Sequence, residues 1–377
     1  MSPSIRFPEF TGEWENKRIG DIGKFFSGGT PSSSRKDFYG GEIPFIRSGE
    51  IHSDKTELFL TQEGYKNSSA KMVEVGDILL ALYGANSGDI SISQMRGAIN
   101  QAILCIRTNV APVFFKSVWE KHAQKILNTY LQGGQGNLSA DIVKKITISI
   151  PSQIEQAKIA ALFSHLDERI SIQNRLIEDL KKFKCAIVEK LYSEIQGKEY
   201  SYRQLFEIIN ERNSRLEYSN VLSASQEKGM VNREDLNLDI KFELSNINTY
   251  KIVREGDYVI HLRSFQGGFA FSNMVGVCSP AYTIMRPKKL LEYGYLSYYF
   301  TSRKFIKSLI IVTYGIRDGR SINVDEWLDM KNIIPSKEQQ QHILRTIRGF
   351  ENKIEVEEMY ASCLSKQKQY LLRQMFI

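Results

Sequence analysis

The sequence predicts an α+β protein in which two related, strand-rich mixed globular domains are separated by two long antiparallel helices that form a coiled coil. Three observations lead to this fold class: an internal repeat, a long apolar heptad pattern after each copy of the repeat, and short, turn-punctuated segments elsewhere. The predicted boundaries are a first domain over 1–150, a central spacer helix over 151–198, a second domain over 199–334 and a C-terminal spacer helix over 335–377.

The repeat is clearest where each long helix is predicted to begin. Ile-Pro-Ser-Gln-Ile-Glu-Gln at 150–156 is matched by Ile-Pro-Ser-Lys-Glu-Gln-Gln at 334–340, an offset of 184 residues (334 minus 150). Ser152 with Glu155 has the capping-box pattern, in which the hydroxyl accepts one N–H of the first turn and the carboxylate reaches back for another. The second copy has the same pattern, so both segments predict a helix entry after an extended strand.

After each entry, apolar residues recur at alternating steps of four and three, the spacing of a coiled-coil seam. The interruptions recur too, because Lys184 and Lys368 occupy the same slot in the two helices. Parallel pairing would bring these two ammonium groups face to face, so antiparallel pairing is expected, with rods of roughly 60 Å. The predicted spacer seam consists of Ile159, Phe163, Leu166, Ile170, Ile177, Leu180, Ile343, Ile347, Phe350, Ile354, Leu364 and Leu371.

The two domains preceding these helices show a fainter repeat. Val-Gly-Asp-Ile-Leu-Leu at 75–80 has a counterpart in Glu-Gly-Asp-Tyr-Val-Ile at 255–260, each a Gly-Asp turn that leads into an apolar strand. Near the far end of each domain, 136–141 corresponds to 320–325. Between these anchors the two domains diverge, which suggests one scaffold used on two different targets.

Composition and charge narrow the class of protein. With 377 residues, 42% of them apolar, the chain is long enough for two buried cores, and a formal charge of +7 permits an anionic partner without requiring one. The four cysteines form no Cys-x-x-Cys pair, which argues against a disulfide framework or zinc site and favours the cytoplasm. The longest apolar runs, Ile78–Leu82 and Leu309–Val312, are too short to cross a bilayer, so no membrane partner is expected.

The motifs of common enzyme classes were not found in the sequence. It contains no phosphate-binding Gly-x-x-x-x-Gly-Lys-Ser/Thr loop, no Gly-x-Gly-x-x-Gly after a strand and no Asn/Asp-Pro-Pro-aromatic motif of amino-methyltransferases. The five histidines show no metal-ligand spacing. We therefore expect no catalytic residue, no metal site and no cofactor in this chain.

Polar, glycine-flanked loops after the core strands are the expected binding sites. Arg, Asn and Gln read base edges bidentately in the major groove, and glycine lets the backbone approach a phosphate. Such loops lie at 83–88, 131–137, 263–268 and 314–320, although each by itself could be an ordinary turn and Arg96 could equally support a strand. The predicted DNA-binding residues are Arg47, Tyr83, Asn86, Ser87, Arg96, Gln132, Gln135, Asn137, Arg263, Ser264, Gln266, Tyr314, Arg317 and Arg320.

Several motifs follow one another along the chain in a recognisable order. They are Trp-Glu-Asn-Lys-Arg-Ile-Gly-Asp-Ile at 14–22, Pro-Phe-Ile-Arg-Ser-Gly-Glu-Ile at 44–51, Val-Gly-Asp-Ile-Leu at 75–79 and the twice-used Ile-Pro-Ser-x-x-x-Gln helix entry. With these motifs the whole chain resembles the specificity subunit of a type I restriction–modification system. The second domain departs from the pattern, because its entry at 200–205 is weaker and nothing in it mirrors 44–51.

The resemblance implies a division of labour. Each globular domain would be a target recognition domain that reads one half of a bipartite double-stranded DNA sequence, and the helices would fix the unread gap between the halves. Two methyltransferase subunits would dock on this chain, and two restriction or motor subunits would join them. S-adenosylmethionine, ATP and Mg²⁺ would then be bound by those partners.

Other interpretations remain open on the sequence alone. The chain could be a stand-alone DNA nuclease or methyltransferase with degenerate motifs, or a coiled-coil adaptor that binds only proteins. The long segments could also be two unrelated surface helices with ordinary amphipathic stripes.

Overall fold

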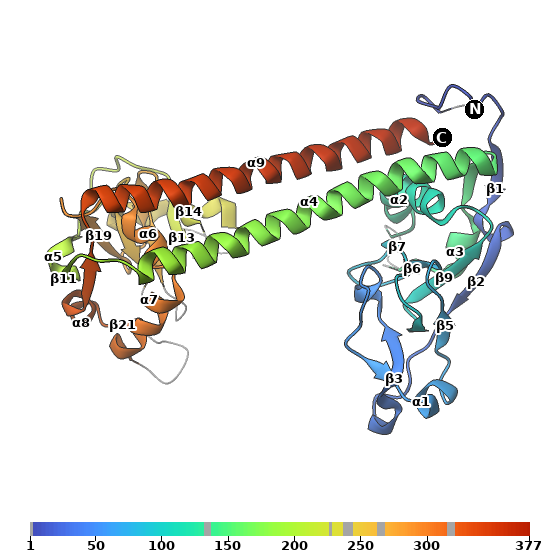
Figure 1. Ribbon diagram of the computed structural model, residues 1–377, viewed down its shortest axis with the longest axis horizontal. Coiled ribbons are helices and arrows are strands. Elements are labelled where there is room, and N and C mark those ends of the chain that lie inside the picture. Colours follow the sequence, from blue (N-terminus) through green and yellow to red (C-terminus); the bar gives the residue numbers. More distant parts are fainter. Residues whose placement is uncertain (1–2, 132–136, 226–227, 237–243, 262–267, 315–320) are drawn as a thin grey trace. The chain divides into compact units, whose positions relative to one another are not determined.

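A computed structural model describes residues 3–131, 137–225, 228–236, 244–261, 268–314 and 321–377 (Figure 1). These residues form two compact units, which we call unit 1 (1–174 with 359–377) and unit 2 (175–358). Each unit therefore contains one strand-rich globule together with part of both long helices. Among the described residues no helix is long and apolar enough to cross a membrane.

Unit 1 contains two four-stranded sheets with the orders β2-β9-β6-β7 and β4-β3-β8-β5, and the separate antiparallel pair β1-β10. Its strands are β1 (Glu15–Arg18), β2 (Gly23–Ser27), β3 (Tyr39–Ile46), β4 (Phe59–Leu60), β5 (Lys71–Val73), β6 (Ile78–Ala81), β7 (Ile90–Ile92), β8 (Gly97–Ile99), β9 (Ile103–Thr108) and β10 (Thr147–Ile150). Its helices and one-turn 3₁₀ helices are η1 (Ile19–Asp21), η2 (Lys36–Phe38), η3 (Ser48–Glu50), α1 (Gln62–Lys66), α2 (Pro112–Leu131) and α3 (Ala140–Lys145).

Unit 2 contains one four-stranded sheet with the order β12-β19-β16-β17 and several two-stranded pairs. Its strands are β11 (Lys198–Ser201), β12 (Phe206–Ile209), β13 (Leu222–Ser225), β14 (Gly229–Asn232), β15 (Lys251–Val253), β16 (Tyr258–Ile260), β17 (Phe269–Phe271), β18 (Gly276–Cys278), β19 (Thr283–Pro287), β20 (Thr313–Tyr314), β21 (Ser321–Ile322) and β22 (Lys331–Ile334). Its shorter helices are α5 (Tyr202–Leu205), η4 (Arg233–Leu236), η5 (Leu244–Thr249), α6 (Tyr295–Tyr299), α7 (Arg303–Ser308), η6 (Leu309–Val312) and α8 (Val324–Asp329).

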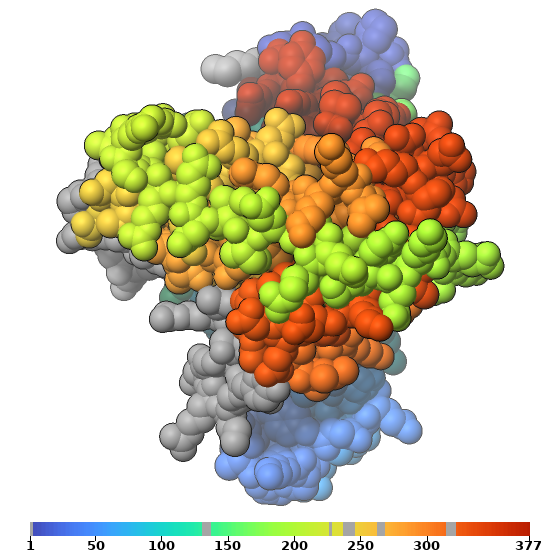
Figure 2. Space-filling model, turned by 90° about the vertical axis from the view of Figure 1, so that its left-hand side faces the viewer, coloured from blue at the N-terminus to red at the C-terminus, as the bar shows by residue number. Residues whose placement is uncertain are grey.

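The two globules are built on the same scaffold, which confirms the predicted relation between them. In the sheets β2-β9-β6-β7 and β12-β19-β16-β17, an apolar strand, β6 or β16, lies between its hairpin partner and a longer antiparallel neighbour. The outer pairs β1-β10 and β11-β22 are also equivalent, since each lies immediately before a long helix. Figure 2 looks onto unit 2 and shows the yellow-green chain around β11 between orange-red atoms from the last part of the chain.

The Gly-Asp turns predicted from the repeat are the same in structural detail. Gly76 and Gly256 adopt φ angles of 94° and 89°, which an L side chain rarely tolerates. The carboxylate of Asp77 accepts a hydrogen bond from the backbone N–H of Glu74 at 2.8 Å and an ion pair from Arg107 at 2.6 Å.

In unit 2, the carboxylate of Asp257 likewise accepts the backbone N–H of Arg254 at 2.9 Å and the guanidinium of Arg286 at 2.9 Å. Each globule thus holds the start of its central strand with an aspartate–arginine clamp.

The long helices are α4 (Gln153–Ser193) and α9 (Lys337–Met375). Ser152 caps α4 as predicted, because its hydroxyl accepts the N–H of Glu155 at 3.3 Å. The reciprocal half of the predicted capping box is wrong for this helix. The Glu155 carboxylate is buried and instead accepts hydrogen bonds from Arg6 at 2.7 Å and from the indole of Trp14 at 3.3 Å.

Within each unit the two helices run antiparallel, as successive contacts show (Figure 1). In unit 1, Asp167 of α4 contacts Lys368 of α9 at 2.7 Å, and Arg169, further along α4, contacts Tyr360, which comes earlier in α9. In unit 2, Lys181 contacts Glu358 at 2.6 Å and Lys184 contacts Glu351 at 3.2 Å. The side chains of the predicted seam are all buried or partly buried; they are Ile159, Phe163, Leu166, Ile170, Ile177, Leu180, Ile343, Ile347, Phe350, Ile354, Leu364 and Leu371.

Candidate nucleic-acid interface

The loop between β6 and β7 has a fixed shape. All four residues of β6 are buried, so the strand is anchored in the core up to Ala81. The backbone N–H of Gly88 donates to the carbonyl of Ala81 at 2.8 Å, and the Ser87 hydroxyl donates to the carbonyl of Leu82 at 2.9 Å. Tyr83 is partly buried against the core, whereas Asn86 is exposed at the tip. A loop held in this way can present an amide to a ligand without a large ordering cost.

Three separate segments of the first globule meet at this loop. The backbone N–H of Leu138, which follows exposed Asn137, donates to the carbonyl of Leu82 at 2.8 Å. On another side, the amide nitrogen of Asn86 lies 3.7 Å from the position that a Cβ on Gly49 would occupy. The structure therefore brings together the loops at 47–52, 83–88 and 137–138, which the sequence analysis singled out separately.

An unpredicted contact joins two of these loops. The His52 imidazole lies 2.8 Å from the Asp89 carboxylate, and this interaction raises the pKa of His52 above its usual 6.5. The spacing between the two residues in the chain gives no indication of the pair. Only the fold reveals it, because β3 and β6 belong to different sheets.

Arg47 directly follows β3, at the start of the loop at 47–52, but its guanidinium already forms ion pairs with two carboxylates. Its guanidinium contacts Glu50 at 2.8 Å and Glu57 at 3.2 Å, and the hydrogen bond with Glu50 raises its pKa. Burial alone would raise the pKa of Glu50, but the hydrogen bonds from Arg47 lower it to about 2. To contact a phosphate or a base, the Arg47 guanidinium would have to share or leave these carboxylates. Glu50 and Glu57 therefore compete with DNA for this guanidinium.

Arg96 is not brought together with the other candidates. It pairs with Glu74 at 3.1 Å, beside the turn that precedes β6, and it stands just before β8. The residues at the opposite end of β8 are the ones that approach the loop region, because Asn100 donates to Ile46 and Ala102 accepts from Leu82. The position of Arg96 fits a role in supporting the Gly-Asp turn.

The candidate loops of unit 2 lie mostly outside the described residues. This applies to Arg263, Ser264, Gln266, Arg317 and Arg320, and in unit 1 to Gln132 and Gln135.

The bases of the two unit 2 loops are described. The N–H of His261 donates to the carbonyl of Gly268 at 2.6 Å, and Thr313 and Tyr314 pair with Ile322 and Ser321. Each loop therefore leaves the globule from an antiparallel strand pair.

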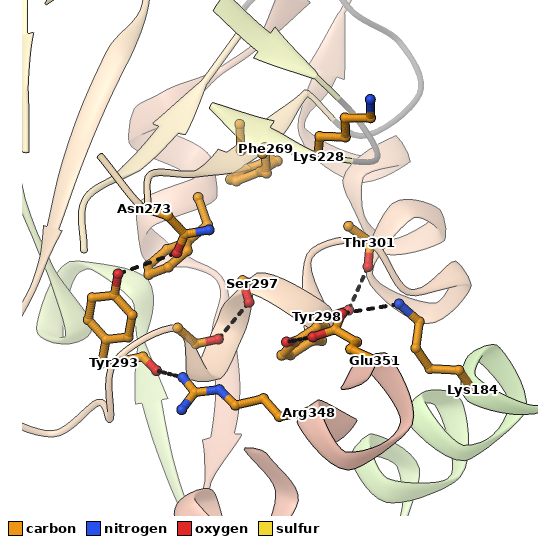
Figure 3. Close-up of a pocket in the computed structure, with 14 residues that line it drawn as sticks. Lys184, Lys228, Phe269, Asn273, Tyr293, Ser297, Tyr298, Thr301, Arg348 and Glu351 are labelled. Carbon is orange, nitrogen blue, oxygen red and sulfur yellow. Dashed lines mark hydrogen bonds and ion pairs between the residues drawn. The ribbon is translucent and has the colours of Figure 1, made fainter. Parts of the chain in front are cut away.

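One cavity of unit 2 lies beside its part of α4 and α9 (Figure 3). It has a volume of about 560 Å³ and is lined by polar, aromatic and charged side chains, among them Lys228 and Arg348. At its edge the Glu351 carboxylate accepts both the Lys184 ammonium at 3.2 Å and the Tyr298 hydroxyl at 2.6 Å.

Unit 1 has a counterpart of this cluster. Asp167 contacts Lys116 at 2.6 Å and Lys368 at 2.7 Å, and Glu120 contacts the same two ammonium groups. Lys368 and Asp167 stand 184 residues from Lys184 and Glu351, so both seam lysines pair with an acid of the opposite helix.

In the described part of the chain, no group of three or more His, Cys, Asp or Glu side chains is placed to hold a metal ion. The described site consists of the loops at 47–52, 83–88 and 137–138, which carry amide, hydroxyl and guanidinium groups. Such a surface can recognise hydrogen-bonding ligands.

Comparison with known proteins finds several that this chain resembles. Residues 11–182 match the family described as the type I restriction modification DNA specificity domain. This stretch is similar to the DNA specificity domain of type I restriction–modification systems. The chain is 27% identical over 198 residues to the type I restriction enzyme MjaIX specificity subunit of Methanocaldococcus jannaschii, which covers 49% of this chain but only 45% of that relative.

The likeness also extends along the whole chain. The MjaVIII specificity subunit of the same organism is 22% identical over 402 residues, covering 98% of this chain and 92% of the relative. The crystal structure of the S subunit of the type I restriction–modification system from M. genitalium matches with a TM-score of 0.57 at 13% identity, covering 100% of this chain and 99% of that one. At this identity the structural match establishes the fold of the specificity subunit.

Proposed function

We propose that this chain is the DNA-reading, non-catalytic subunit of a type I restriction–modification complex. Each globule reads one half of a bipartite double-stranded DNA target, and α4 and α9 set the number of unread base pairs between the halves. The observation that carries the proposal is the duplicated scaffold. Both globules keep the same sheet order and the same aspartate–arginine clamp, while the loops that leave the strands differ in sequence.

The loop chemistry supports DNA as the ligand. Around 83–88, the first globule presents an exposed asparagine amide on a pinned loop, next to an arginine whose charge is held by two carboxylates. Amide and guanidinium groups read adenine and guanine edges, and backbone groups near glycine can meet phosphates. A shared scaffold with two different sets of loops is what reading two different half-sites requires.

The remaining parts of the reaction are assigned to partners. Two methyltransferase subunits dock on the long helices, and two restriction or motor subunits complete the complex in the cytoplasm. S-adenosylmethionine, ATP and Mg²⁺ are bound by these partners. The members of the family named above support this assignment through their description as specificity subunits of type I restriction enzymes.

Exchange of one globule tests the proposal. Residues 1–150 are replaced by those of a relative with a different target, and the methylated sites of host DNA are mapped with the partner subunits present. One half of the modified sequence should change while the other half and the gap stay the same. A change in both halves, or in neither, contradicts the assignment of one half-site to each globule.

A second experiment separates this role from that of an enzyme or an adaptor. The purified chain is incubated with DNA, Mg²⁺ and S-adenosylmethionine, and no methyl transfer or cleavage is expected; turnover would identify a stand-alone enzyme. In the complete complex, Gln135→Ala and Arg317→Ala should abolish modification and leave assembly intact. Equal loss of both would indicate a protein adaptor.

A further inference from the structure

The apolar run at 309–312 has an unusual placement in unit 2. Within η6, Leu309 and Val312 are buried in the core, whereas Ile310 and Ile311 between them are 67% and 75% exposed. Burying such side chains is favourable, so two adjacent isoleucines that remain in solvent mark a candidate contact surface.

The turn that carries these isoleucines is rigid. The Thr313 hydroxyl donates to the carbonyl of Leu309 at 2.5 Å, and the N–H of Asn323 donates to the carbonyl of Val312 at 2.9 Å. Just before the turn, Phe305 is fully buried, and its N–H donates to the hydroxyl of Ser302, which caps α7. The isoleucines are therefore held out from the core on both sides.

The same face carries positive charge. Arg303, Lys304 and Lys307 of α7 are exposed. Lys307 follows the other two cations by four and three residues and precedes the two isoleucines by three and four, the spacing of one helix face. Among the described residues no carboxylate forms an ion pair with any of these three side chains. We name this surface the basic–isoleucine face; it consists of Arg303, Lys304, Lys307, Ile310 and Ile311.

We propose that the basic–isoleucine face contacts the DNA of the second half-site, with Ile310 and Ile311 acting as a wedge between neighbouring base pairs. This inference rests on the proposed function. Apolar wedges unstack and kink a duplex in other DNA-binding proteins, while nearby cations neutralise the phosphates on either side. A wedge must be rigid, because a mobile side chain would yield before the base stack did.

Two features favour DNA over a protein as the occupant. Three exposed cations of α7 precede the isoleucines within one helical segment. Their charge complements a polyanion, and they would be costly to desolvate in an apolar protein interface. In addition, β20 directly follows η6, and the pair β20-β21 forms the base of a predicted reading loop (Figure 1). The isoleucines therefore adjoin the described base of this loop in the chain.

The first globule has no such pair at the corresponding place in the chain. Counting back 184 residues from 309–312 leads to 125–128, which lies inside α2. There Ile126 is buried and Leu127 packs partly into the core, while Lys125 and Asn128 are exposed. The wedge therefore predicts that only the second half-site is distorted.

The test uses the complete complex and a duplex that carries the target found by methylation mapping. Adenines are replaced one at a time by 2-aminopurine, whose fluorescence rises when a base is unstacked. The adenines that are methylated are left unsubstituted, because methyltransferases flip their target base out of the duplex. At the other positions of the wild-type complex we expect a rise at one step of the second half-site and none in the first. Ile310→Ser with Ile311→Ser should remove the rise and weaken DNA binding by at least about tenfold, whereas Ile310→Met with Ile311→Met should retain both.

A matched control replaces two other exposed isoleucines of unit 2, Ile208→Ser with Ile333→Ser, which are 43% and 46% exposed. This variant should bind and unstack DNA like the wild type. A second variant, with Arg303, Lys304 and Lys307 changed to glutamine, should reduce the slope of log affinity against log salt by up to about 2.7, since each phosphate contact contributes about 0.9.

Several outcomes would overturn the wedge. The wedge is wrong if fluorescence stays constant throughout the second half-site in the wild-type complex. It is also wrong if Ile310→Ser with Ile311→Ser binds and unstacks DNA as well as the control Ile208→Ser with Ile333→Ser. Loss of partner subunits from the Ile310/Ile311 serine variant would show that the face binds protein instead. Failure of the proposed function is distinguishable, because scrambling the second half-site would then leave wild-type affinity unchanged.

Discussion

Replacing Asp167 by asparagine should destabilise unit 1 by about 2 kcal/mol. The Asp167 carboxylate contacts the ammonium groups of Lys116 and Lys368 at 2.6 and 2.7 Å, and the two lysine side chains are only 17% and 16% exposed. A hydrogen bond to a charged group contributes about 1.5 to 3 kcal/mol. Asparagine keeps one acceptor oxygen and Glu120 still contacts both lysines, so the loss should fall near the middle of that range.

Removing the second acid as well should cost more. Asp167→Asn with Glu120→Gln leaves two largely buried ammonium groups without a carboxylate, which typically costs about 3 to 5 kcal/mol. Urea unfolding of the full chain measures both changes, because two of the three tryptophans, Trp14 and Trp119, lie in unit 1. The matched control is Asp141→Asn, also in unit 1, whose exposed ion pair with Lys144 should contribute less than about 0.5 kcal/mol.

The acid dependence of stability follows from the same cluster. Burial would raise the pKa of Asp167, but hydrogen bonds from Lys116 and Lys368 lower it below its usual 3.8. A lowered folded pKa contributes stability above pH 3.8 that is lost as the pH falls through the folded value. Asp167→Asn should therefore lose part of the acid sensitivity of unit 1. Equal stability of Asp167→Asn and the wild type at pH 7 would refute the inference that the ion pairs of Asp167 stabilise the packing of α4 against α9 in unit 1.

Three further predictions concern the globules. Asp257→Ala should destabilise unit 2 by about 3 kcal/mol in urea unfolding, because it removes the buried partner of Arg286 and a turn hydrogen bond. Asp89→Asn should lower the pKa of His52 toward 6.5 in an NMR titration. In the wild type the raised pKa means that the stability from the His52–Asp89 ion pair is fully present below pH 6.5 and is lost as the pH rises through the folded value. The contact between the two loops should therefore weaken in alkaline solution. Gly76→Ala should cost about 1 kcal/mol in thermal unfolding, because open space surrounds the site and the positive φ alone opposes the side chain.

Each of these changes has a control in the chain. Asp329→Ala removes an exposed partner of Arg203 and should have little effect on stability, in contrast to the buried Asp257. Gly12→Ala places a Cβ in open space at a residue without a positive φ and should not cost what Gly76→Ala costs. An unchanged titration of His52 in Asp89→Asn would show that the two loops are not coupled through this pair.

The long helices and the internal duplication were predictable from sequence because they depend on local and periodic signals. Both helix starts follow a serine cap, and the seam positions fall within α4 and α9. The antiparallel direction could be predicted because Lys184 and Lys368 occupy equivalent seam positions. Their acidic partners could not be predicted, because Asp167 and Glu351 become neighbours of these lysines only once the chain has folded back.

The candidate site was predictable in its location but not in its electrostatics. The loop after β6 could be predicted from its glycines and polar residues. The ion pair of Arg47 with Glu57 could not, because Glu57 lies ten residues later, in the segment between η3 and β4 that the fold brings back to Arg47. Arg96 was grouped with the reading loops because the sequence does not show which end of β8 lies near those loops. The capping role expected of the Glu155 carboxylate failed for a similar reason, since Arg6 from the start of the chain takes it.

A paired insertion in the long helices tests the central claim most directly. Four residues are inserted after Asn174 in α4 and four after Glu358 in α9, an insertion that locally unwinds a coiled coil without ending its apolar seam. Each helix lengthens by about 6 Å, close to two base pairs at about 3.4 Å per pair. Methylation mapping with the partner subunits should then return the same two half-sites with a gap about two base pairs longer. An unchanged gap, or altered half-sites, would contradict the account.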